Sequence, residues 1–288
     1  MISIVLIAAG HPYSNLPNKE SEETLCCKRS PSCCIRKSPW CTGGARTVLP
    51  GDDVMENIDP AKRLADKVAE IRARMDAAAR ASGRDPADVS LCAACKARSS
   101  DVVRLSAALD IDIFGENRMQ EMQEHMMANA FAGKPCHFIG KLQNNKVRHV
   151  VGKVSLIQSV DSLRLLDSLQ REAARQTVIQ DILFEINLGE EESKAGAKAN
   201  SLRTLMDTAA ACPNLKVRGL MAIPPVTDSE GKARRYFSKL RELLEVMGTW
   251  RYANAQPDIL SMGMSDSYEA AIREGATIVR IGRGIYGE

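Results

Sequence analysis

The residue with the clearest chemical potential is a lysine that follows an apolar stretch. Residues 89–95 are small or apolar and lead directly into Lys96, a pattern that predicts a strand buried on both faces. A lysine at the end of such a strand would lie half in a low dielectric, which lowers the pKa of its ammonium group. The neutral amine attacks carbonyl carbons and forms a Schiff base. A solvated lysine at a strand end, without chemical function, is the alternative.

The last two predicted strands end in sequences that suit an anion. After the seventh strand, Ser265 opens a predicted helix with a hydroxyl and free backbone N–H groups, and Asp266 is able to cap it. After the eighth strand, Gly282 and Gly284 allow backbone amides to approach a ligand, and Arg283 adds positive charge. Phosphate sites of β/α barrels are commonly built from these two loops. The alternative is that the glycines only turn the chain.

An arginine in the last predicted strand adds a third group. Arg280 lies two residues before Gly282, so in a strand both face the barrel mouth. A pairing of Arg280 with a barrel carboxylate is the alternative. Together, a carbonyl-seeking Lys96, an anion cradle and an inward arginine fit a phosphorylated aldehyde. Pyridoxal phosphate is the cofactor that binds as a lysine Schiff base with a partner for its ring nitrogen, and an arginine partner disfavours protonation of that nitrogen.

The elements that must bring these groups together alternate between strand and helix. The predicted strands cover residues 89–95, 111–115, 136–140, 154–159, 182–187, 216–221, 259–261 and 278–281. Amphipathic helices lie between them, for example at residues 102–109, 163–176, 202–211 and 233–247. Eight strands joined by helices predict an α/β fold, a (β/α)8 TIM barrel with functional groups at the carboxyl ends of its strands. A doubly wound open sheet is the alternative, although no G-x-G-x-x-G motif follows the first strand.

The folded part is expected to be a single domain of residues 56–288. It begins with an N-cap at Asp59 and a proline at the first helical position, and Gly83 ends this helix. Residues 1–55 lack periodicity and are rich in Ser, Pro and Gly. We expect them to be a disordered N-terminal extension, or translated sequence upstream of a start at Met55.

Composition argues against several classes of partner. The net charge of +3 gives no electrostatic reason to expect nucleic acid, and no apolar run approaches the length of a membrane helix. Five of the nine cysteines fall in the first 41 residues, but without the spacing of a metal site; a metal or disulfide cluster there is the alternative. The other four are typical of buried thiols in a reducing compartment, so we expect a cytoplasmic protein or, alternatively, a mitochondrial one.

Several motifs, in order along the chain, resemble those of the pyridoxal-phosphate homeostasis protein family, formerly called proline synthetase co-transcribed homologues. The matching stretches, within residues 60–287, are Phe114-Gly-Glu-Asn117 with Gln120-Glu121, His137-Phe-Ile-Gly-Lys-Leu-Gln-Asn-Asn-Lys146, Ile186-Asn187 through Glu192-Ser-Lys194-Ala-Gly196, Gly219-Leu-Met-Ala-Ile-Pro224, Ser261-Met-Gly-Met-Ser-Asp266 and Val279-Arg-Ile-Gly282. The resemblance implies a barrel similar to the corresponding domain of bacterial alanine racemase.

The resemblance also implies a site for pyridoxal 5′-phosphate, in which Lys96 is the Schiff-base lysine and Asn117 lies beside the ring. Arg280 would face the pyridine nitrogen. The phosphate would be held by Ser265, Gly282 and Arg283.

The sequence departs from the family pattern at three places. The family usually has a serine before the lysine and Lys-Pro after it. Here Cys95 precedes the lysine, and Arg98-Ser99 stands where Lys-Pro is usual. Arg98 keeps the charge, but the loss of the proline is expected to loosen this loop. Arg283 stands where a small hydroxyl residue is usual, so its phosphate contact would rest on the backbone or on charge. The chain ends at Glu288, so a closing C-terminal helix is expected to be missing or short.

Two classes of function follow from the resemblance. In the first, a monomer binds pyridoxal phosphate without catalysis and passes it to apo forms of enzymes that need it, with no nucleic-acid or membrane partner. In the second, the chain is an enzyme, either a racemase-like one or a Schiff-base aldolase without cofactor. Racemisation needs an acid–base group on each face of the substrate, and the second group of alanine racemases comes from a domain that this sequence lacks. Tyr268 and Tyr286 are the candidate substitutes, but the non-catalytic function is favoured.

Overall fold

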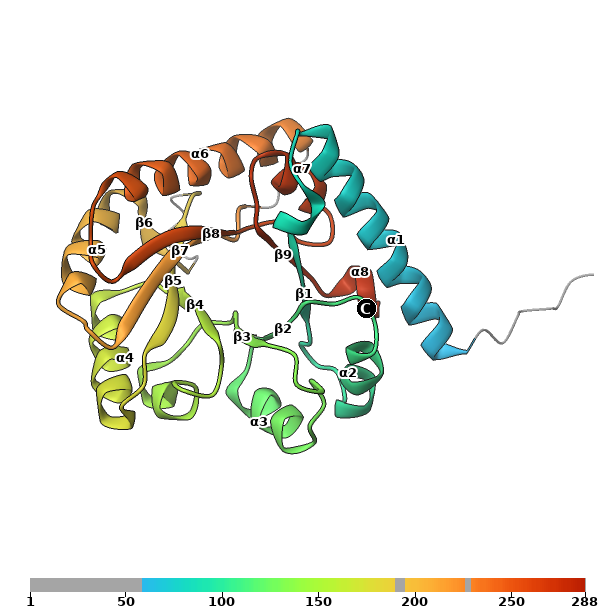
Figure 1. Cartoon of the computed structure of the whole chain (residues 1–288), viewed down its shortest axis with the longest axis horizontal. Coiled ribbons are helices and arrows are strands. Elements are labelled where there is room, and N and C mark those ends of the chain that lie inside the picture. Colours follow the sequence, from blue (N-terminus) through green and yellow to red (C-terminus); the bar gives the residue numbers. More distant parts are fainter. Residues whose placement is uncertain (1–58, 190–194, 226–228, 288) are drawn as a thin grey trace, which may run out of the picture. The chain divides into compact units, whose positions relative to one another are not determined.

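Figure 1 shows the computed structural model of the chain, which describes residues 59–189, 195–225 and 229–287. The predictions made for residues 1–55, and the part of the motif that covers residues 190–194, lie outside the described residues. Within the described ranges, no helix is both long and apolar enough to cross a membrane. The same ranges contain no group of histidine, cysteine and acidic side chains that could hold a metal ion.

Parallel strands close into a barrel at the centre of the fold. In chain order they are β1 (Ser90–Ala94), β2 (Ile113–Glu116), β3 (Cys136–Phe138), β4 (Leu156–Val160), β5 (Gln180–Asn187), β7 (Leu215–Met221), β8 (Ala255–Ser261) and β9 (Ile278–Ile281). Each pairs in parallel with the next, and β9 pairs with β1, so these strands form a closed ring. A short strand, β6 (Ala197–Lys198), pairs only with the end of β5. The predicted barrel is confirmed, and the open-sheet alternative is wrong.

Helices surround this ring of strands (Figure 1). They are α1 (Pro60–Ala81), α2 (Ser100–Ala107), α3 (Met119–Met127), α4 (Leu163–Gln176), α5 (Leu202–Ala210), α6 (Glu230–Thr249), α7 (Tyr268–Arg273) and α8 (Arg283–Tyr286). The connection between β3 and β4 differs from the predicted pattern, because it holds a 3₁₀-helix, η2 (Asn144–His149), and no α-helix. Shorter 3₁₀ segments precede β1 and α5, namely η1 (Pro86–Asp88) and η3 (Ala199–Ser201).

The first helix begins where the sequence predicts. Asp59 accepts a hydrogen bond from the backbone of Ala61, and Pro60 occupies the first helical position, where its missing N–H would have no partner in any case. The buried face of α1, which includes Val68 and Ile71, packs against α7 and α8. The helix therefore covers the side of the barrel from which the last two loops emerge.

Alternating side chains of the strands divide the apolar core into two layers. One layer fills the inside of the barrel and contains Cys92, Ile113, Ile139, Leu156, Leu183, Met221 and Ile278. The other lies between strands and helices, where Phe114 and Phe184, next in sequence to Ile113 and Leu183, are fully buried. Both faces of each strand are covered, so a shift of one residue in strand pairing would exchange the side chains of the two layers. Packing therefore fixes the strand register, and the register decides which polar side chains point into the barrel.

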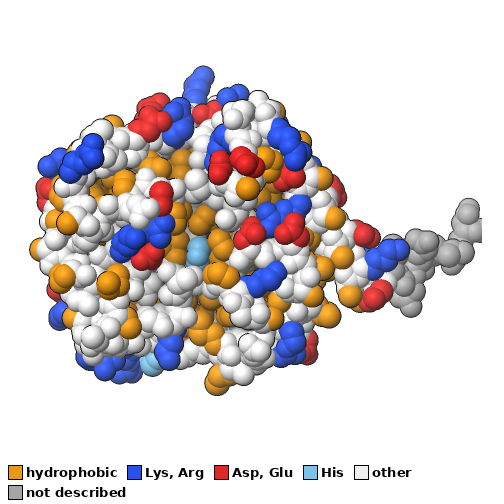
Figure 2. Space-filling view, viewed as in Figure 1, with side chains coloured by type: hydrophobic (Ala, Val, Ile, Leu, Met, Phe, Trp, Pro, Cys, Tyr) orange, Lys and Arg blue, Asp and Glu red, His pale blue; other side chains and the backbone are white. Residues whose placement is uncertain are grey.

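The charged side chains on the face seen in Figure 2 are of mixed sign. Lysine, arginine and acidic side chains alternate around the rim, while apolar side chains gather near the centre of this view. A surface of this kind does not concentrate one sign of charge, which agrees with the net charge of +3.

Candidate functional site

Lys96 follows β1 directly and begins the loop to α2. The loop is a tight turn, in which the N–H of Arg98 donates to the carbonyl oxygen of Cys95 at 3.0 Å. The Lys96 side chain is exposed, so the half-buried, low-dielectric position expected from the sequence is wrong. The start of the turn is nevertheless well anchored, because Cys95 is fully buried and its N–H donates to the carbonyl oxygen of Gly115 on β2.

Asn117 follows β2, the neighbour of β1, and is partly buried. Its backbone is closely packed against the end of β3 through Gly140. A Cβ atom at position 140 would lie only 2.2 Å from the carbonyl oxygen of Asn117, so glycine is required there. The Gly140 of the sequence motif therefore fixes the backbone that carries Asn117.

Arg280 lies inside the barrel, only 4% exposed. Its Nη1 donates to the hydroxyl of Ser261 at 2.6 Å, and its Nη2 donates to the carbonyl of Ala222 at 2.9 Å. Burial lowers the pKa of Arg280, although a guanidinium keeps its proton in proteins. The alternative pairing with a barrel carboxylate is wrong, because among the described residues no acidic side chain lies within ion-pair distance of Arg280.

A chain of hydrogen bonds continues from Arg280 across the barrel. Since Ser261 accepts from Arg280, its own hydroxyl donates to Oε1 of Gln158, at 2.6 Å. The amide nitrogen of Gln158 then donates to Nδ1 of His137, at 2.9 Å. Arginine only donates, so every direction in this interior chain (Arg280, Ser261, Gln158, His137) is determined. It makes His137 neutral with its proton on Nε2, and burial lowers the pKa of His137 to about 4.

Glu185 is a buried acid in the same interior, two residues along β5 from Leu183 of the inner layer. Burial, and then the charge of Asp161, raise the pKa of Glu185 to about 7, against the opposite effects of Arg280 and Lys141. The carboxyl group is therefore partly protonated near neutral pH. The sequence showed only an alternating strand here, and a charged residue at an inward position was the signal that could have found it.

The loops after β8 and β9 meet beside the end of β1. The N–H of Gly284 donates to Oγ of Ser265 at 3.1 Å, which joins the two loops. A Cβ atom at position 282 would lie 3.2 Å from the carbonyl oxygen of Ala94, so Gly282 lets the loop approach the last residue of β1 closely. Arg283 forms an ion pair with Asp266. Asp266 is therefore not the helix cap predicted from the sequence; Ser267 holds the N-cap position of α7.

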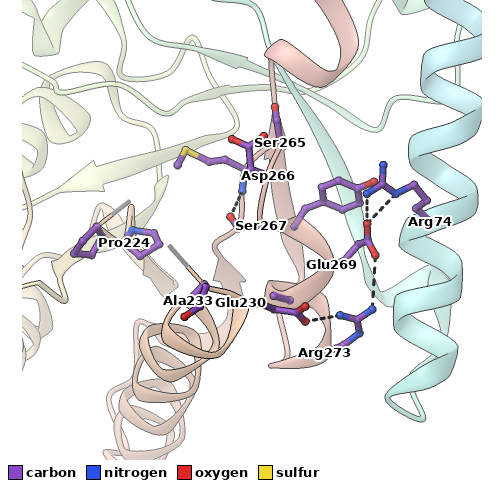
Figure 3. A pocket seen from close by; sticks show the side chains of 14 residues that line it. Arg74, Pro224, Glu230, Ala233, Ser265, Asp266, Ser267, Glu269 and Arg273 are labelled. Atoms are coloured by element: carbon purple, nitrogen blue, oxygen red, sulfur yellow. Dashed lines mark hydrogen bonds and ion pairs between the residues drawn. The ribbon is translucent and has the colours of Figure 1, made fainter. Parts of the chain in front are cut away.

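A cavity of about 710 Å³ lies beside these loops (Figure 3). Ser265 and Asp266 line one side of it. Along another side, Arg273 bridges Glu230 of α6, at 2.7 Å, and Glu269 of its own helix, at 3.6 Å. Glu269 is in turn hydrogen-bonded to Arg74 of α1. This line of ion pairs joins the three helices that flank the loop after β8.

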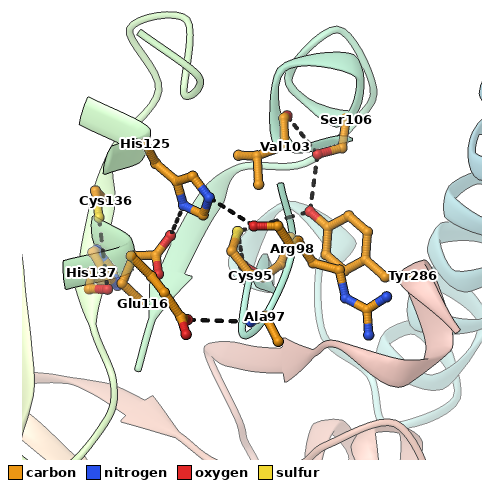
Figure 4. Close-up of polar contacts among 12 residues, drawn as sticks. Cys95, Ala97, Arg98, Val103, Ser106, Glu116, His125, Cys136, His137 and Tyr286 are labelled. Carbon is orange, nitrogen blue, oxygen red and sulfur yellow. Dashed lines mark hydrogen bonds and ion pairs between the residues drawn. The ribbon is translucent and has the colours of Figure 1, made fainter. Parts of the chain in front are cut away.

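The two tyrosines considered as catalytic groups lie elsewhere. Tyr286 packs outside the strands, where its hydroxyl is 3.0 Å from Oγ of Ser106 and 3.9 Å from Sγ of Cys95 (Figure 4). Burial raises the pKa of Tyr286. Tyr268 is only 3% exposed, and the guanidinium of Arg74 lies over its ring at 5.5 Å. Both phenols belong to the apolar layer between strands and helices, so neither is placed as a base inside the barrel mouth.

The structure thus brings together most of the predicted site. Lys96, Arg280 and the loops with Ser265, Gly282 and Arg283 come from β1, β9 and β8, which are neighbours in the ring. Asn117 follows β2 on the other side of β1. Sequence reasoning missed Gln158 altogether, and it placed Ser261 in a motif without a role, because only folding makes these two residues neighbours of Arg280 and His137.

The sequence matches the family model of the alanine racemase N-terminal domain over residues 67–288. Among curated relatives, the pyridoxal phosphate homeostasis protein of Aquifex aeolicus is 40% identical over 223 residues, which are 77% of this chain and 97% of the relative. The proteins of that name from Pseudomonas aeruginosa and Escherichia coli (strain K12) are 38% and 34% identical, each over 78% of this chain and 95% and 96% of their own lengths.

Solved structures agree with these relatives. A solved structure described as an unknown protein from Bifidobacterium adolescentis superposes with a TM-score of 0.74 at 31% identity, over 79% of this chain and 97% of that one. PipY of Synechococcus elongatus, solved with pyridoxal phosphate bound, gives a TM-score of 0.67 at 27% identity, over 78% and 100% of the two chains. Alanine racemase of Corynebacterium glutamicum gives 0.60 at 14% identity, over 79% and 61%, which supports the fold alone.

Proposed function

Because the chain belongs to the pyridoxal phosphate homeostasis protein family, we propose that it binds pyridoxal 5′-phosphate and serves as a reservoir or carrier of this cofactor. One observation carries the proposal. A lysine, a buried arginine and a pair of glycine-containing loops come from three neighbouring strands, β1, β9 and β8, and open at one end of the barrel. A phosphorylated aldehyde needs these three groups, and the donors present fit it.

Lys96 would hold the aldehyde end. When bound, the cofactor would supply an aldehyde carbon, and the Lys96 nitrogen would hold it as a Schiff base. An exposed side chain on a firmly based turn suits reversible capture, because the amine is accessible to an incoming ligand. Asn117, from the neighbouring strand, would lie beside the ring.

The phosphate end would lie against the loops after β8 and β9. The Ser265 oxygen accepts the Gly284 N–H, so its own proton is available to a phosphate oxygen. Gly282 brings the backbone close to the end of β1, where a side chain would stand in the way. Arg283 would add charge, in competition with its present partner Asp266.

Arg280 would face the ring nitrogen, and its environment argues for binding without catalysis. It is a fixed donor, held by Ser261 and Ala222, so it offers a hydrogen bond to an unprotonated ring nitrogen and disfavours protonation there. An unprotonated ring is a weak electron sink. Neither candidate tyrosine is placed to move a proton, so no observation favours a racemase.

The cellular compartment and the binding partners belong to the same proposal. The four described cysteines outside the first 58 residues are buried free thiols, which suits a reducing compartment such as the cytoplasm. We expect a monomer whose partners are the cofactor and apo-enzymes that require it. The face in Figure 2 carries no contiguous positive patch of the kind that binds nucleic acid.

Borohydride reduction of the cofactor-loaded protein, followed by peptide mapping, tests the site. The label is expected on the peptide that contains Lys96. Lys96→Ala should lose the covalent adduct and still fold, because an exposed side chain contributes little packing; Lys141→Ala, an exposed lysine after β3, is the matched control. A label on Lys141 or Lys146 in the wild-type chain would contradict the assignment.

Two further measurements separate the carrier from the enzyme. Loaded protein mixed with an apo-enzyme, in the presence of a phosphatase that destroys free cofactor, should restore the activity of that enzyme. Amino acids incubated with loaded protein in D₂O should show negligible exchange of the α-proton. Exchange at an enzymic rate that Lys96→Ala abolishes would overturn the carrier proposal in favour of a racemase-like enzyme.

A further inference from the structure

The turn that carries Lys96 has a backbone conformation that its own sequence does not favour. Ala97 has φ of 57°, in the left-handed region, although it is not glycine. A Cβ atom makes this region costly, so such residues persist only where their surroundings hold them. The sequence also lacks the proline that would stiffen the loop. Something outside the turn must therefore stabilise it.

Two side chains of α3 contact this turn. Oε2 of Glu121 accepts the N–H of Ala97 at 3.2 Å. Nε2 of His125 lies 3.0 Å from the carbonyl oxygen of Arg98 (Figure 4). The two contacts hold the backbone of Ala97 and Arg98, the two residues that follow Lys96. We call Glu121 and His125 the α3 clasp.

His125 keeps its hydrogen bond to the carbonyl oxygen of Arg98 whether or not Glu116 is protonated. Arg98 offers only a carbonyl oxygen, so Nε2 of His125 must carry a proton. Nδ1 of the same ring lies 2.6 Å from Oε1 of Glu116, which shares one proton with it. Both side chains are at most 2% exposed. Burial raises the pKa of Glu116, and its hydrogen bond raises the pKa of His125, so the proton stays in the pair.

We propose that the α3 clasp positions Lys96 for covalent capture of the cofactor, and that its strength sets how firmly the cofactor is retained. This inference rests on the proposed function, because it takes Lys96 to be the capturing residue. Neither clasp residue is placed to touch the ligand; both act through the backbone of residues 97 and 98. A strained turn held by two side chains can yield, which suits a protein that must also release its ligand.

The test compares two ligands that differ only at the carbon that Lys96 attacks. Pyridoxal 5′-phosphate has an aldehyde there, whereas 4′-deoxypyridoxine 5′-phosphate has a methyl group and reports the rest of the site. Glu121→Leu removes the acceptor and Glu121→Gln keeps one. Glu124→Leu changes an exposed acid on the same helix as the control. His125→Phe removes the donor to Arg98 while keeping a ring against Phe131, which His125 contacts at 5.9 Å between ring centroids.

The expected result is selective. Glu121→Leu and His125→Phe should weaken the aldehyde ligand roughly tenfold and speed its release, while the methyl analogue binds as to the wild type. Glu121→Gln and Glu124→Leu should stay close to wild type. Adding Ala97→Gly to Glu121→Leu should restore affinity, because glycine adopts the left-handed conformation without help.

Each other outcome has a definite meaning. Equal loss of both ligands, or no rescue by glycine, would show that the clasp only supports the fold and would overturn the proposal. Unchanged affinity for the aldehyde in both clasp variants would overturn it as well. If the wild type and Lys96→Ala bound the aldehyde equally well, the proposed function of Lys96 would fail instead, which keeps the two failures distinct. A readout that needs no cofactor is the rate at which a small active ester acylates the Lys96 amine of the ligand-free protein, measured by peptide mapping. Glu121→Leu should change this rate and Glu124→Leu should not, and equal rates in the wild type and Glu121→Leu would contradict the proposal.

Discussion

The two sides of the site, the interior chain behind Arg280 and the turn that carries Lys96, are held in place in different ways. Arg280 is buried, and each of its side-chain partners comes from the barrel wall or the residue after it. Lys96 is exposed, and its turn is held by side chains of a helix outside the barrel. The first arrangement is closely constrained, because the direction of each hydrogen bond from Arg280 to His137 is determined. The second holds the backbone through two hydrogen bonds from outside the turn and leaves the Lys96 side chain exposed to solvent.

This difference suits a protein that holds a cofactor and gives it up again. A fixed arginine recognises the ring in one orientation, whereas a yielding turn lets the covalent bond form and break. The two parts are also connected, since Arg98 of the turn donates from its side chain to the carbonyl of Gly287, at 3.3 Å, just after α8. The lysine turn therefore contacts the segment that follows the phosphate loops.

The largest expected effect is on the free energy of unfolding, through the hydrogen bonds of the interior chain. Gln158→Leu should lower the free energy of unfolding by about 3 kcal/mol, because it leaves the buried Ser261 hydroxyl and His137 without their partner. Urea denaturation of the ligand-free protein measures this loss. Gln176→Leu, a half-buried glutamine outside the barrel that donates to Glu172, is the control and should cost less than about 1 kcal/mol. A loss as small as the control would show that the interior chain does not hold the barrel together.

The next largest effect is on acid stability, through the buried His137. Its pKa is about 4 in the folded protein against 6.5 for an ordinary histidine, so between these values the unfolded chain binds the extra proton. Stability is therefore lost as the pH falls from 6.5 towards 4, by about 3 kcal/mol at most. His137→Phe should remove this part of the pH dependence in urea titrations, whatever its stability at pH 7. Parallel curves for the two proteins between pH 6.5 and 4.5 would contradict the buried, neutral assignment.

The smallest effect is expected at the turn. Ala97→Gly alone should raise stability by roughly 0.5–1 kcal/mol, because relief of the left-handed Cβ outweighs the added freedom of the unfolded chain. Thr177→Gly, at another left-handed residue (φ 57°) that ends α4 far from the site in sequence, is the matched control. Both should gain stability in thermal melts, but only Ala97→Gly should change the rate of cofactor capture. A gain in capture rate from Thr177→Gly would remove the special role of the turn.

Much of the fold was predictable because it repeats one pattern. Apolar strands bounded by turn residues and followed by amphipathic helices indicated the barrel, and the start of α1 followed from a cap and a proline. The edges of the elements shifted by a few residues; β8 begins at Ala255 rather than at residue 259. Its first residues alternate between exposed and half-buried and include Pro257, so they lack the apolar signal of a buried strand.

The predicted polar residues also lie at the expected end of the barrel, because the strands are parallel and their carboxyl ends share that end. Environments were harder to predict. Lys96 was expected to be half-buried and is exposed, because Cys95 is the last buried residue and Lys96 already belongs to the loop. Asp266 was expected to cap a helix and instead pairs with Arg283, which lies 17 residues further along the chain. Pairings over such distances leave no local pattern to read.

What the sequence by itself determined is therefore the alternation of strand and helix, the closure into a barrel, and the order of the residues at the strand ends. These follow from periodicity and from the types of residue that end each strand. Only the tertiary structure decided which polar groups stand behind them. Gln158 meets His137 because β4 pairs with β3, and it meets Ser261 because the closed ring brings β8 across the interior. His125 meets Arg98 because α3 packs beside β2. Hydrogen bonds of this kind depend on distances of about 3 Å between atoms of different elements, which the packing of the whole barrel sets.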